Sequence, residues 1–303
     1  MSDAKQIFEE LKLLATEQRN PRTADIDLAA TEEILQLMNG EDLRVAEVVG
    51  GAIPQIAAAV EQVVASFQGG GRLIYVGAGT SGRLGVLDSS ECPPTFGVAP
   101  EMVVGVIAGG RETVFLSREG VEDDEAAAVA DMERHRVKAK DTVVGITASR
   151  RTPYVIAALA SARRVGASTV FLTCNPASHA DVDVEINVVV GPEAVTGSTR
   201  LKAGTAQKMV LNMISTASMI RLGKVYGNLM VDLKPASHKL EERAKGIIGL
   251  LAGIDYDEAA DVYRRSGKNV KIGVVMAKMG VTKKDAEQTL ARAGGFLKRA
   301  LGE

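Results

Sequence analysis

The sequence predicts an α/β fold in which a parallel β-sheet carries helices on both faces. Between about residues 72 and 221, short apolar runs alternate with segments of helical periodicity. Strands that alternate with helices of this length build parallel sheets covered on both sides. The 303-residue chain is 46% hydrophobic and 24% charged, as in ordinary globular proteins. Its length allows about two domains, at roughly 150 residues each.

The predicted elements follow from apolar periodicity and from glycine and proline stops. Strands are expected at 72–76, 102–107, 142–147 and 168–173, with an extended run at 182–190. Helices are expected between them at 82–90, 122–136, 153–165 and 201–221, and before them at 1–15, 31–38, 42–49 and 54–67. Three helices at 257–265, 269–278 and 283–292 predict a small bundle. The expected domains are a helical segment 1–60, a sheet domain 61–225 and a bundle 240–303.

A glycine- and hydroxyl-rich turn, Gly77-Ala78-Gly79-Thr80-Ser81-Gly82, follows the first strand. Glycines let the backbone approach a ligand, and the N–H groups of a helix start attract anions. The turn satisfies G-x-G-x-x-G, but no acidic residue ends the second strand and no Gly-Lys-Ser/Thr follows, which excludes dinucleotide and Walker A sites. Thr80 and Ser81 suit a single phosphate monoester. The alternative is a helix N-cap without a ligand.

Two later loops repeat this chemistry. Ser149 and Thr152 follow the strand at 142–147, and a hydroxyl-rich loop at 195–205 carries Arg200 and Lys202. The ligand of such a sheet lies at the carboxyl ends of its strands, so the loops that begin at 77, 109, 148 and 191 are expected to form one cleft. The sequence therefore predicts a phosphosugar-type site. Thr152 as a plain N-cap remains the alternative.

Two glutamates are candidates for acid–base chemistry. Glu91 is expected at the end of the helix at 82–90, just before Cys92-Pro93-Pro94, where the helix dipole disfavours a carboxylate and so favours proton transfer. Glu122 follows the second strand in an acidic segment, and its alternative is the first turn of a solvated helix. The three histidines lack metal-ligand spacing and form no nucleophilic triad. We therefore expect carboxylate chemistry with no metal and no cofactor.

Charge and composition exclude some classes of binding partner and indicate a cellular location. A net charge of −2 gives no electrostatic case for nucleic acid or an anionic membrane. Aromatic residues make up 4% and Trp is absent, which argues against base stacking. We recognise no signal peptide and no apolar run of ~20 residues. Cys92 and Cys174 lack C-x-x-C spacing, so a reducing cytoplasm is the expected location.

Seven segments resemble one family over almost the whole chain: 16–21, 25–27, 77–85, 90–97, 151–157, 195–212 and 227–232. They are similar to the N-acetylmuramic acid 6-phosphate etherases, which carry a sugar isomerase (SIS) domain. The resemblance implies a SIS-type three-layer sandwich that cleaves the D-lactyl ether of N-acetylmuramic acid 6-phosphate. It implies Glu91 as proton donor to the departing ether oxygen and Glu122 as its partner. We expect Thr80, Ser81, Ser149, Thr152 and Lys202 to bind the phosphate and the sugar, and the resemblance implies a homodimer with sites near the interface.

Arg150 departs from the family pattern, which often has glycine between the serine and the arginine of this loop. A positive φ there would make arginine a costly fit. The alternatives are an aldose–ketose isomerase on the same fold and a non-catalytic phosphosugar sensor, as in the related glucokinase regulatory protein. The segment at 90–94 favours the etherase over the isomerase. Residues 1–70 lack the basic helix-turn-helix that a transcriptional regulator would need.

Overall fold

A computed structural model describes residues 14–177, 180–234 and 237–303. The helix predicted at 1–15 therefore lies almost entirely outside the described residues, as does His179. The chain divides into two compact units. The first comprises the residues up to Ser90 together with Glu101–Ser215, and the second comprises Glu91–Pro100 and Thr216–Glu303.

The first unit contains a five-stranded sheet in the order β2-β1-β3-β4-β5, with every neighbouring pair parallel. The predicted α/β fold with a parallel sheet is thus confirmed. The fifth strand is shorter than the extended run expected at 182–190. The strands are β1 (Leu73–Gly77), β2 (Val103–Ile107), β3 (Thr142–Thr147), β4 (Ser168–Thr173) and β5 (Val184–Asn187).

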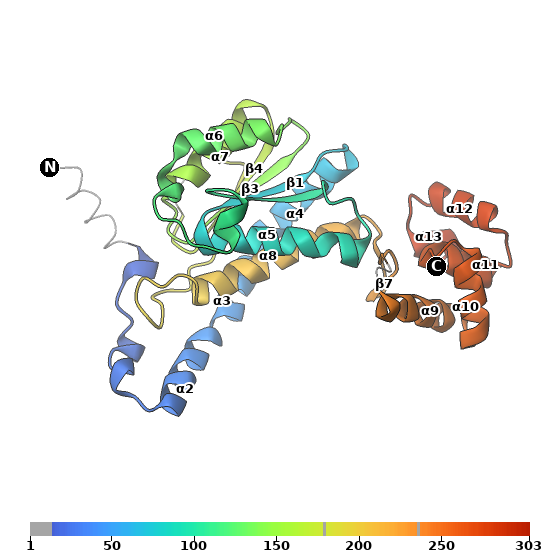
Figure 1. Cartoon of the computed structure of the whole chain (residues 1–303), viewed down its shortest axis with the longest axis horizontal. Coiled ribbons are helices and arrows are strands. Elements are labelled where there is room, and N and C mark those ends of the chain that lie inside the picture. The colour runs from blue at the N-terminus through green and yellow to red at the C-terminus, as the bar shows by residue number, and fades with distance from the viewer. Residues whose placement is uncertain (1–13, 178–179, 235–236) are drawn as a thin grey trace. The chain divides into compact units, whose positions relative to one another are not determined.

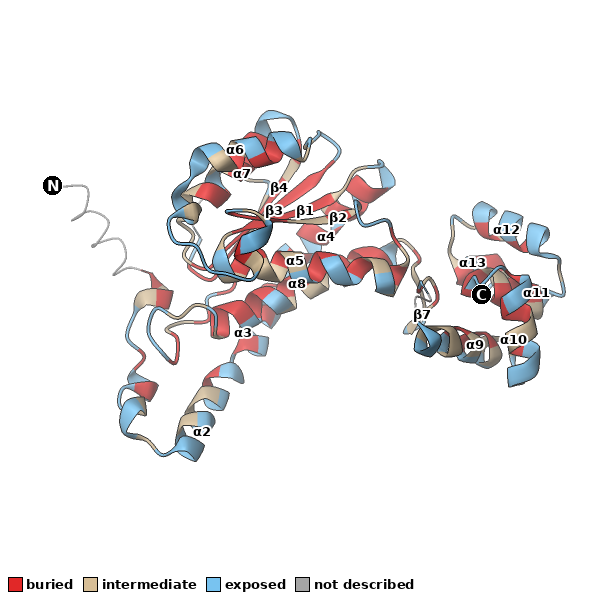
Figure 2. Ribbon diagram, in the orientation of Figure 1, coloured by how far each residue is buried: buried red, intermediate tan, exposed pale blue. Residues whose placement is uncertain are grey.

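Helices cover both faces of this sheet (Figure 1). On one face, α6 (Glu125–Arg134) and α7 (Pro153–Arg164) pack on a buried apolar cluster that includes Ile74, Val143 and Phe171. The other face holds α4 (Ile53–Gln68) and the first parts of α5 (Gly79–Phe96) and α8 (Lys202–Arg221). Figure 2 shows the strands buried between these layers.

A segment of short helices precedes the sheet. It contains η1 (Ala15–Glu17), η2 (Pro21–Thr23), η3 (Ile26–Leu28), α2 (Thr31–Asp42) and α3 (Val45–Gly51). Much of α2 is exposed (Figure 2), and Leu28, Leu35 and Leu43 present large apolar side chains to solvent.

The prediction that the helix after β1 ends at Glu91 is wrong, because α5 continues through Pro93 and Pro94 to Phe96. The two prolines lack the N–H groups that would bond to the carbonyls of Ser89 and Ser90. The hydroxyls of the same two serines donate to the carbonyls of Val86 and Leu87. Glu91 therefore lies within a helix and not at its end.

The second unit has a helical core over residues 237–303. The three predicted helices are found as α10 (Tyr256–Arg265), α11 (Val270–Met279) and α12 (Lys283–Arg292). Two more helices share their apolar core, α9 (His238–Ala252) and α13 (Leu297–Leu301). The bundle is therefore larger than predicted. A short antiparallel pair, β6 (Val225–Tyr226) and β7 (Leu229–Met230), precedes it.

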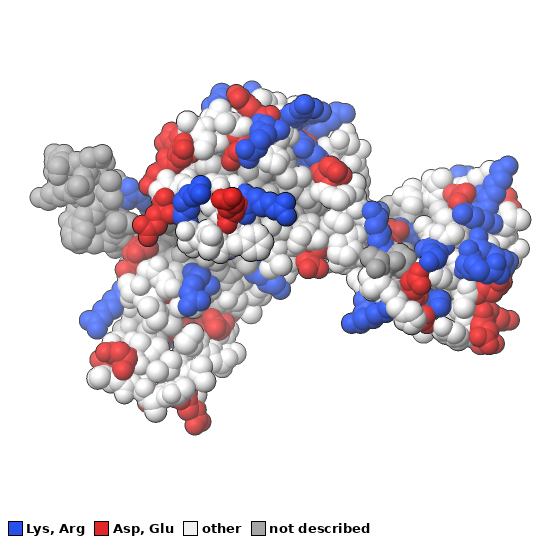
Figure 3. Space-filling model, in the orientation of Figure 1, with Lys and Arg blue, Asp and Glu red and all other residues white. Residues whose placement is uncertain are grey.

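Within the described residues, no single helix is long and apolar enough to cross a membrane. One bent pair, Thr31–Gly51 with Ile53–Gln68, passes that test by length and composition only. On the face seen in Figure 3, basic and acidic side chains are interspersed.

Candidate active site

A pocket of about 390 Å³ lies in the first unit at the carboxyl ends of β1 and β3. These strands are neighbours, and the strand order reverses between them, which is where ligands bind in open parallel sheets. The four loops expected to converge all contribute to the pocket, together with the N-terminal segment. Its lining includes Glu17, Gly79, Thr80, Ser81, Arg83, Arg118, Glu119, Glu122, Ser149, Thr152 and Thr199.

The loop after β1 folds tightly onto the start of α5. A Cβ atom at Gly77 would lie 2.7 Å from the backbone nitrogen of Gly82, and a Cβ at Gly82 would lie 2.6 Å from the carbonyl oxygen of Gly77. Both positions therefore need glycine, and Gly79 has a positive φ of 53°. This turn puts Thr80 and Ser81 in the first turn of α5, where backbone N–H groups have no partner within the helix.

The two predicted hydroxyls after β3 belong to a small hydroxyl cluster. The hydroxyl oxygens of Thr147 and Thr152 are 2.7 Å apart, and those of Thr147 and Ser149 are 3.4 Å apart. Thr152 occupies the N-cap position of α7, yet its side chain makes no capping hydrogen bond. The plain N-cap interpretation of Thr152 therefore does not describe its hydroxyl, which lies at the pocket.

Arg150 has a φ of 62°, the left-handed conformation that favours glycine. The loop thus has the strain that the departure from the family pattern predicts. The guanidinium compensates by donating to the carbonyl of Pro176 at 3.1 Å. Arginine is accommodated here, and the loop still presents Ser149 to the pocket.

Glu122 lies in η5 (Val121–Asp123), a short 3₁₀ helix between β2 and α6. The capping of α6 is done by Asp124, whose carboxylate accepts from the backbone of Ala127 at 2.8 Å. Glu122 is therefore not part of the first turn of α6. Arg83 anchors the preceding loop by donating to the carbonyls of Thr113 and Val114 at 2.7 and 2.9 Å.

Glu91 does not line this pocket. It is an exposed residue of α5, twelve positions after Gly79. At ~1.5 Å per residue, that separation is about 18 Å along the helix axis. The structure therefore brings Glu122 together with both hydroxyl loops, but it does not bring Glu91 to the loop that begins the same helix.

Lys202 does not line the pocket either. Its side chain is 1% exposed, forms an ion pair with Glu41 of α2 and donates to the carbonyl of Val190 at 3.1 Å. Glu41 also accepts from Arg22. The hydrogen bond from Arg22, aided by Lys202, lowers the pKa of Glu41 to about 2 despite its burial. This buried network is the role that the structure shows for Lys202.

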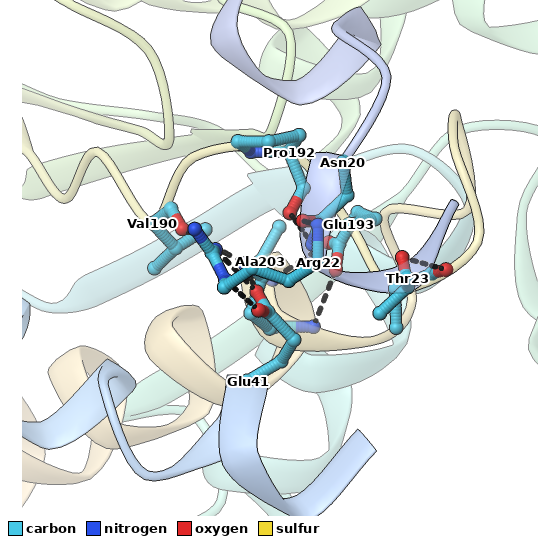
Figure 4. A network of polar contacts seen from close by, with 10 residues as sticks. Asn20, Arg22, Thr23, Glu41, Val190, Pro192, Glu193 and Ala203 are labelled. Carbon is cyan, nitrogen blue, oxygen red and sulfur yellow. Dashed lines mark hydrogen bonds and ion pairs between the residues drawn. The ribbon is translucent and has the colours of Figure 1, made fainter. Parts of the chain in front are cut away.

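The same network fastens the N-terminal segment to the loop at 190–203 (Figure 4). Asn20 donates to the carbonyl of Pro192 at 3.2 Å, and Thr23 donates to that of Ala194 at 2.9 Å. Glu193 accepts from the backbone N–H groups of Lys202 and Ala203 at the start of α8. The dense run of polar residues at 16–23 was the sequence feature that could have pointed to these contacts. Nothing in that run indicates which residues it bonds to.

Across the part of the chain that the structure describes, no group of three or more His, Cys, Asp or Glu is arranged to hold a metal ion. The groups that the pocket offers to a ligand are hydroxyls, backbone N–H groups, arginines and carboxylates.

Comparison with known proteins assigns the chain to a family. Residues 55–163 match the model described as the glucokinase regulatory protein N-terminal SIS domain. The N-acetylmuramic acid 6-phosphate etherase of Clostridium beijerinckii is 50% identical, covering 97% of this chain and 97% of that protein. The etherase of Geobacillus sp. (strain WCH70) is 53% identical, covering 96% and 99%. That of Bacillus subtilis (strain 168) is 50% identical, covering 96% and 96%. With half of its residues shared over nearly its whole length, the chain belongs to the N-acetylmuramic acid 6-phosphate etherase family.

Proposed function

We propose that this enzyme converts N-acetylmuramic acid 6-phosphate into N-acetylglucosamine 6-phosphate and D-lactate, in the recycling of cell-wall amino sugars. The observation that carries the proposal is the shared pocket of Glu122 and the two hydroxyl loops at neighbouring strand ends. The curated relatives, all named for this etherase activity, support it.

The 6-phosphate binds at the start of α5. Its oxygens accept from the free N–H groups of the first helical turn and from Thr80 and Ser81 on one side. Ser149 and Thr152 face the same pocket from the β3 side. Lys202 is not a direct ligand in this proposal, because its ammonium group is held by Glu41. It supports the site through the loop that carries Thr199.

The reaction proceeds by elimination and then hydration. In the open-chain sugar, the C1 aldehyde acidifies the hydrogen on C2. A carboxylate removes that proton, the C3–O bond breaks, and the departing lactate oxygen receives a proton from a carboxylic acid. Water then adds at C3 of the unsaturated aldehyde and C2 is reprotonated. Glu91 acts as the proton donor to the ether oxygen, and Glu122 is the partner acid–base group.

We also propose a homodimer, and it accounts for the position of Glu91. With about 18 Å of rigid helix between Glu91 and the phosphate loop of its own chain, Glu91 serves the pocket of a second copy. The exposed apolar side chains Leu28, Leu35 and Leu43 give such a copy a surface to bury. Cys92 and Cys174 are both buried thiols, which fits the reducing cytoplasm that we propose as the location.

The decisive test is D-lactate release from N-acetylmuramic acid 6-phosphate by the purified protein, in water enriched in heavy oxygen and with a chelator present. We expect lactate to appear, with solvent oxygen in the amino sugar and none in the ether oxygen of the lactate. Solvent oxygen in the lactate would contradict the elimination route. Saturable sugar phosphate binding without lactate would replace the proposal with a sensor.

A further inference from the structure

Glu17 places a carboxylate in the pocket that the proposed reaction does not use. It lines the same pocket as Ser81, Ser149 and Glu122, and it comes from η1 in the N-terminal segment. Its side chain is half-buried. Its carboxylate makes no hydrogen bond or ion pair with any other described residue.

The fold holds the turn that carries Glu17 against the loop that follows β3. Asn175 is fully buried, and its Oδ1 accepts from the backbone of Ala15 at 2.7 Å. Its Nδ2 donates to the hydroxyl of Thr16 at 3.1 Å and to the carbonyl of Ala148 at 2.8 Å. Because Ala148 itself lines the pocket, one amide side chain joins η1 directly to the loop that presents Ser149.

Residues that follow Glu17 in the N-terminal segment are also held by hydrogen bonds. Asn20 and Thr23 bond to the loop at 190–203, which brings Thr199 to the pocket. Glu17 thus lies between two sets of hydrogen bonds, each of which ends on a loop of the site. These bonds involve the neighbours of Glu17 and leave its carboxylate free to act on a ligand.

A free carboxylate would repel a substrate that carries a phosphate and a lactyl carboxylate. The repulsion is offset when the carboxylate accepts hydrogen bonds from donors on the ligand, and the hydroxyl groups of a sugar are such donors. We propose that Glu17 is a substrate-binding residue that accepts hydrogen bonds from sugar hydroxyls and orients the sugar while the hydroxyl loops hold its phosphate. This assignment rests on the proposed phosphosugar function.

Glu17→Gln tests the assignment because it keeps the shape of the side chain and removes its charge. The two probes, compared by calorimetry, are N-acetylglucosamine 6-phosphate and inorganic phosphate. We expect the variant to bind the sugar phosphate at least about tenfold more weakly, since hydrogen bonds to a charged acceptor are lost. We expect it to bind inorganic phosphate as well as the unmodified protein or better, since a like charge is removed. Glu47→Gln, an exposed site on α3, is the matched control.

Three results would overturn the assignment. Unchanged affinity for both probes would show that Glu17 does not touch the sugar. Tighter binding of both would show that it only repels anions, and weaker binding of both would show that it supports the loops. Lactate release by the unmodified protein is scored separately. If release fails while Glu17→Gln selectively weakens sugar phosphate binding, the etherase proposal falls and the role of Glu17 stands.

Discussion

The hydroxyl of Ser81 donates a hydrogen bond to Oε1 of Gln207 at 2.9 Å, and both side chains are buried. Ser81 can donate to a phosphate oxygen only if that hydrogen is released, for example when the amide of Gln207 turns and donates its own hydrogen to Ser81. An amide side chain can donate or accept a hydrogen bond, whereas an ionised carboxylate can only accept one.

Gln207→Glu should therefore weaken phosphate binding. The new carboxylate would keep the hydrogen of Ser81 and would add a negative charge behind the phosphate site. We expect at least about tenfold weaker binding of N-acetylglucosamine 6-phosphate and of inorganic phosphate, measured by calorimetry. Gln55→Glu, on an exposed position of α4, is the control for charge alone. Equal affinity in the two variants would remove Ser81 from the set of phosphate donors.

Mixed dimers should reveal whether Glu91 serves a second copy. We expect Glu91→Gln and Glu122→Gln to abolish lactate release when each is pure, while both still bind the sugar phosphate. After subunit exchange in an equal mixture, half of the dimers are mixed and each mixed dimer has one intact site. Activity should then return to about a quarter of that of the unmodified enzyme.

The control for this experiment is the same mixture assayed before subunits exchange, which should stay inactive. Persistent inactivity after exchange, with mixed dimers demonstrated by mass, would place Glu91 in the pocket of its own chain. Near-normal activity of pure Glu91→Gln would contradict its role as the acid.

Acid should weaken the fold through Glu41. Its pKa is lowered in the folded protein from 4.5 to about 2, chiefly by Arg22. A lowered pKa means that the stabilisation is complete above pH 4.5 and is lost as pH falls toward 2. Glu41→Gln should flatten the fall in unfolding free energy over this range. It should also cost about 3 kcal/mol or more at pH 7, because Lys202 is left buried without its counter-charge.

Urea unfolding at a series of pH values measures both effects of Glu41→Gln. Glu33→Gln, exposed on the same helix, should change the free energy of unfolding by no more than ~0.5 kcal/mol. If the two variants showed the same pH profile, the network of Glu41 and Lys202 would contribute nothing to the acid sensitivity.

Arg150→Gly should be tolerated in spite of the lost contact with Pro176. The left-handed conformation costs a non-glycine residue ~1–2 kcal/mol, and glycine avoids this cost. We expect a thermal midpoint equal to or above that of the unmodified protein, with lactate release within a few-fold. Arg150→Val, which adds a branched Cβ to the same backbone, should lower both. A lower midpoint for glycine than for valine would mean that the guanidinium, and not the backbone, governs this loop.

The parts of the fold that local sequence encodes were predictable. The strands β3 and β4 lie within the predicted residues, and the hydroxyl loops after β1 and β3 meet at one pocket. Apolar runs and glycine turns carry these signals within a few positions. The partner of Lys202 was not predictable, because Glu41 lies 161 positions away and nothing in the sequence around Lys202 indicates burial. The length of α5 was misjudged because two prolines normally end a helix, whereas α5 continues through Pro93 and Pro94 to Phe96.

The bonds of Asn175 imply an order of events during synthesis and folding. Ala15 bonds to a side chain 160 positions further along, so the segment around Ala15 has no docking place until β4 and the residues beyond it have been made. Closing so long a loop is entropically costly and slow. A nascent chain that ends before the loop at 190–203 therefore lacks the partners that hold residues 15–23 at the site.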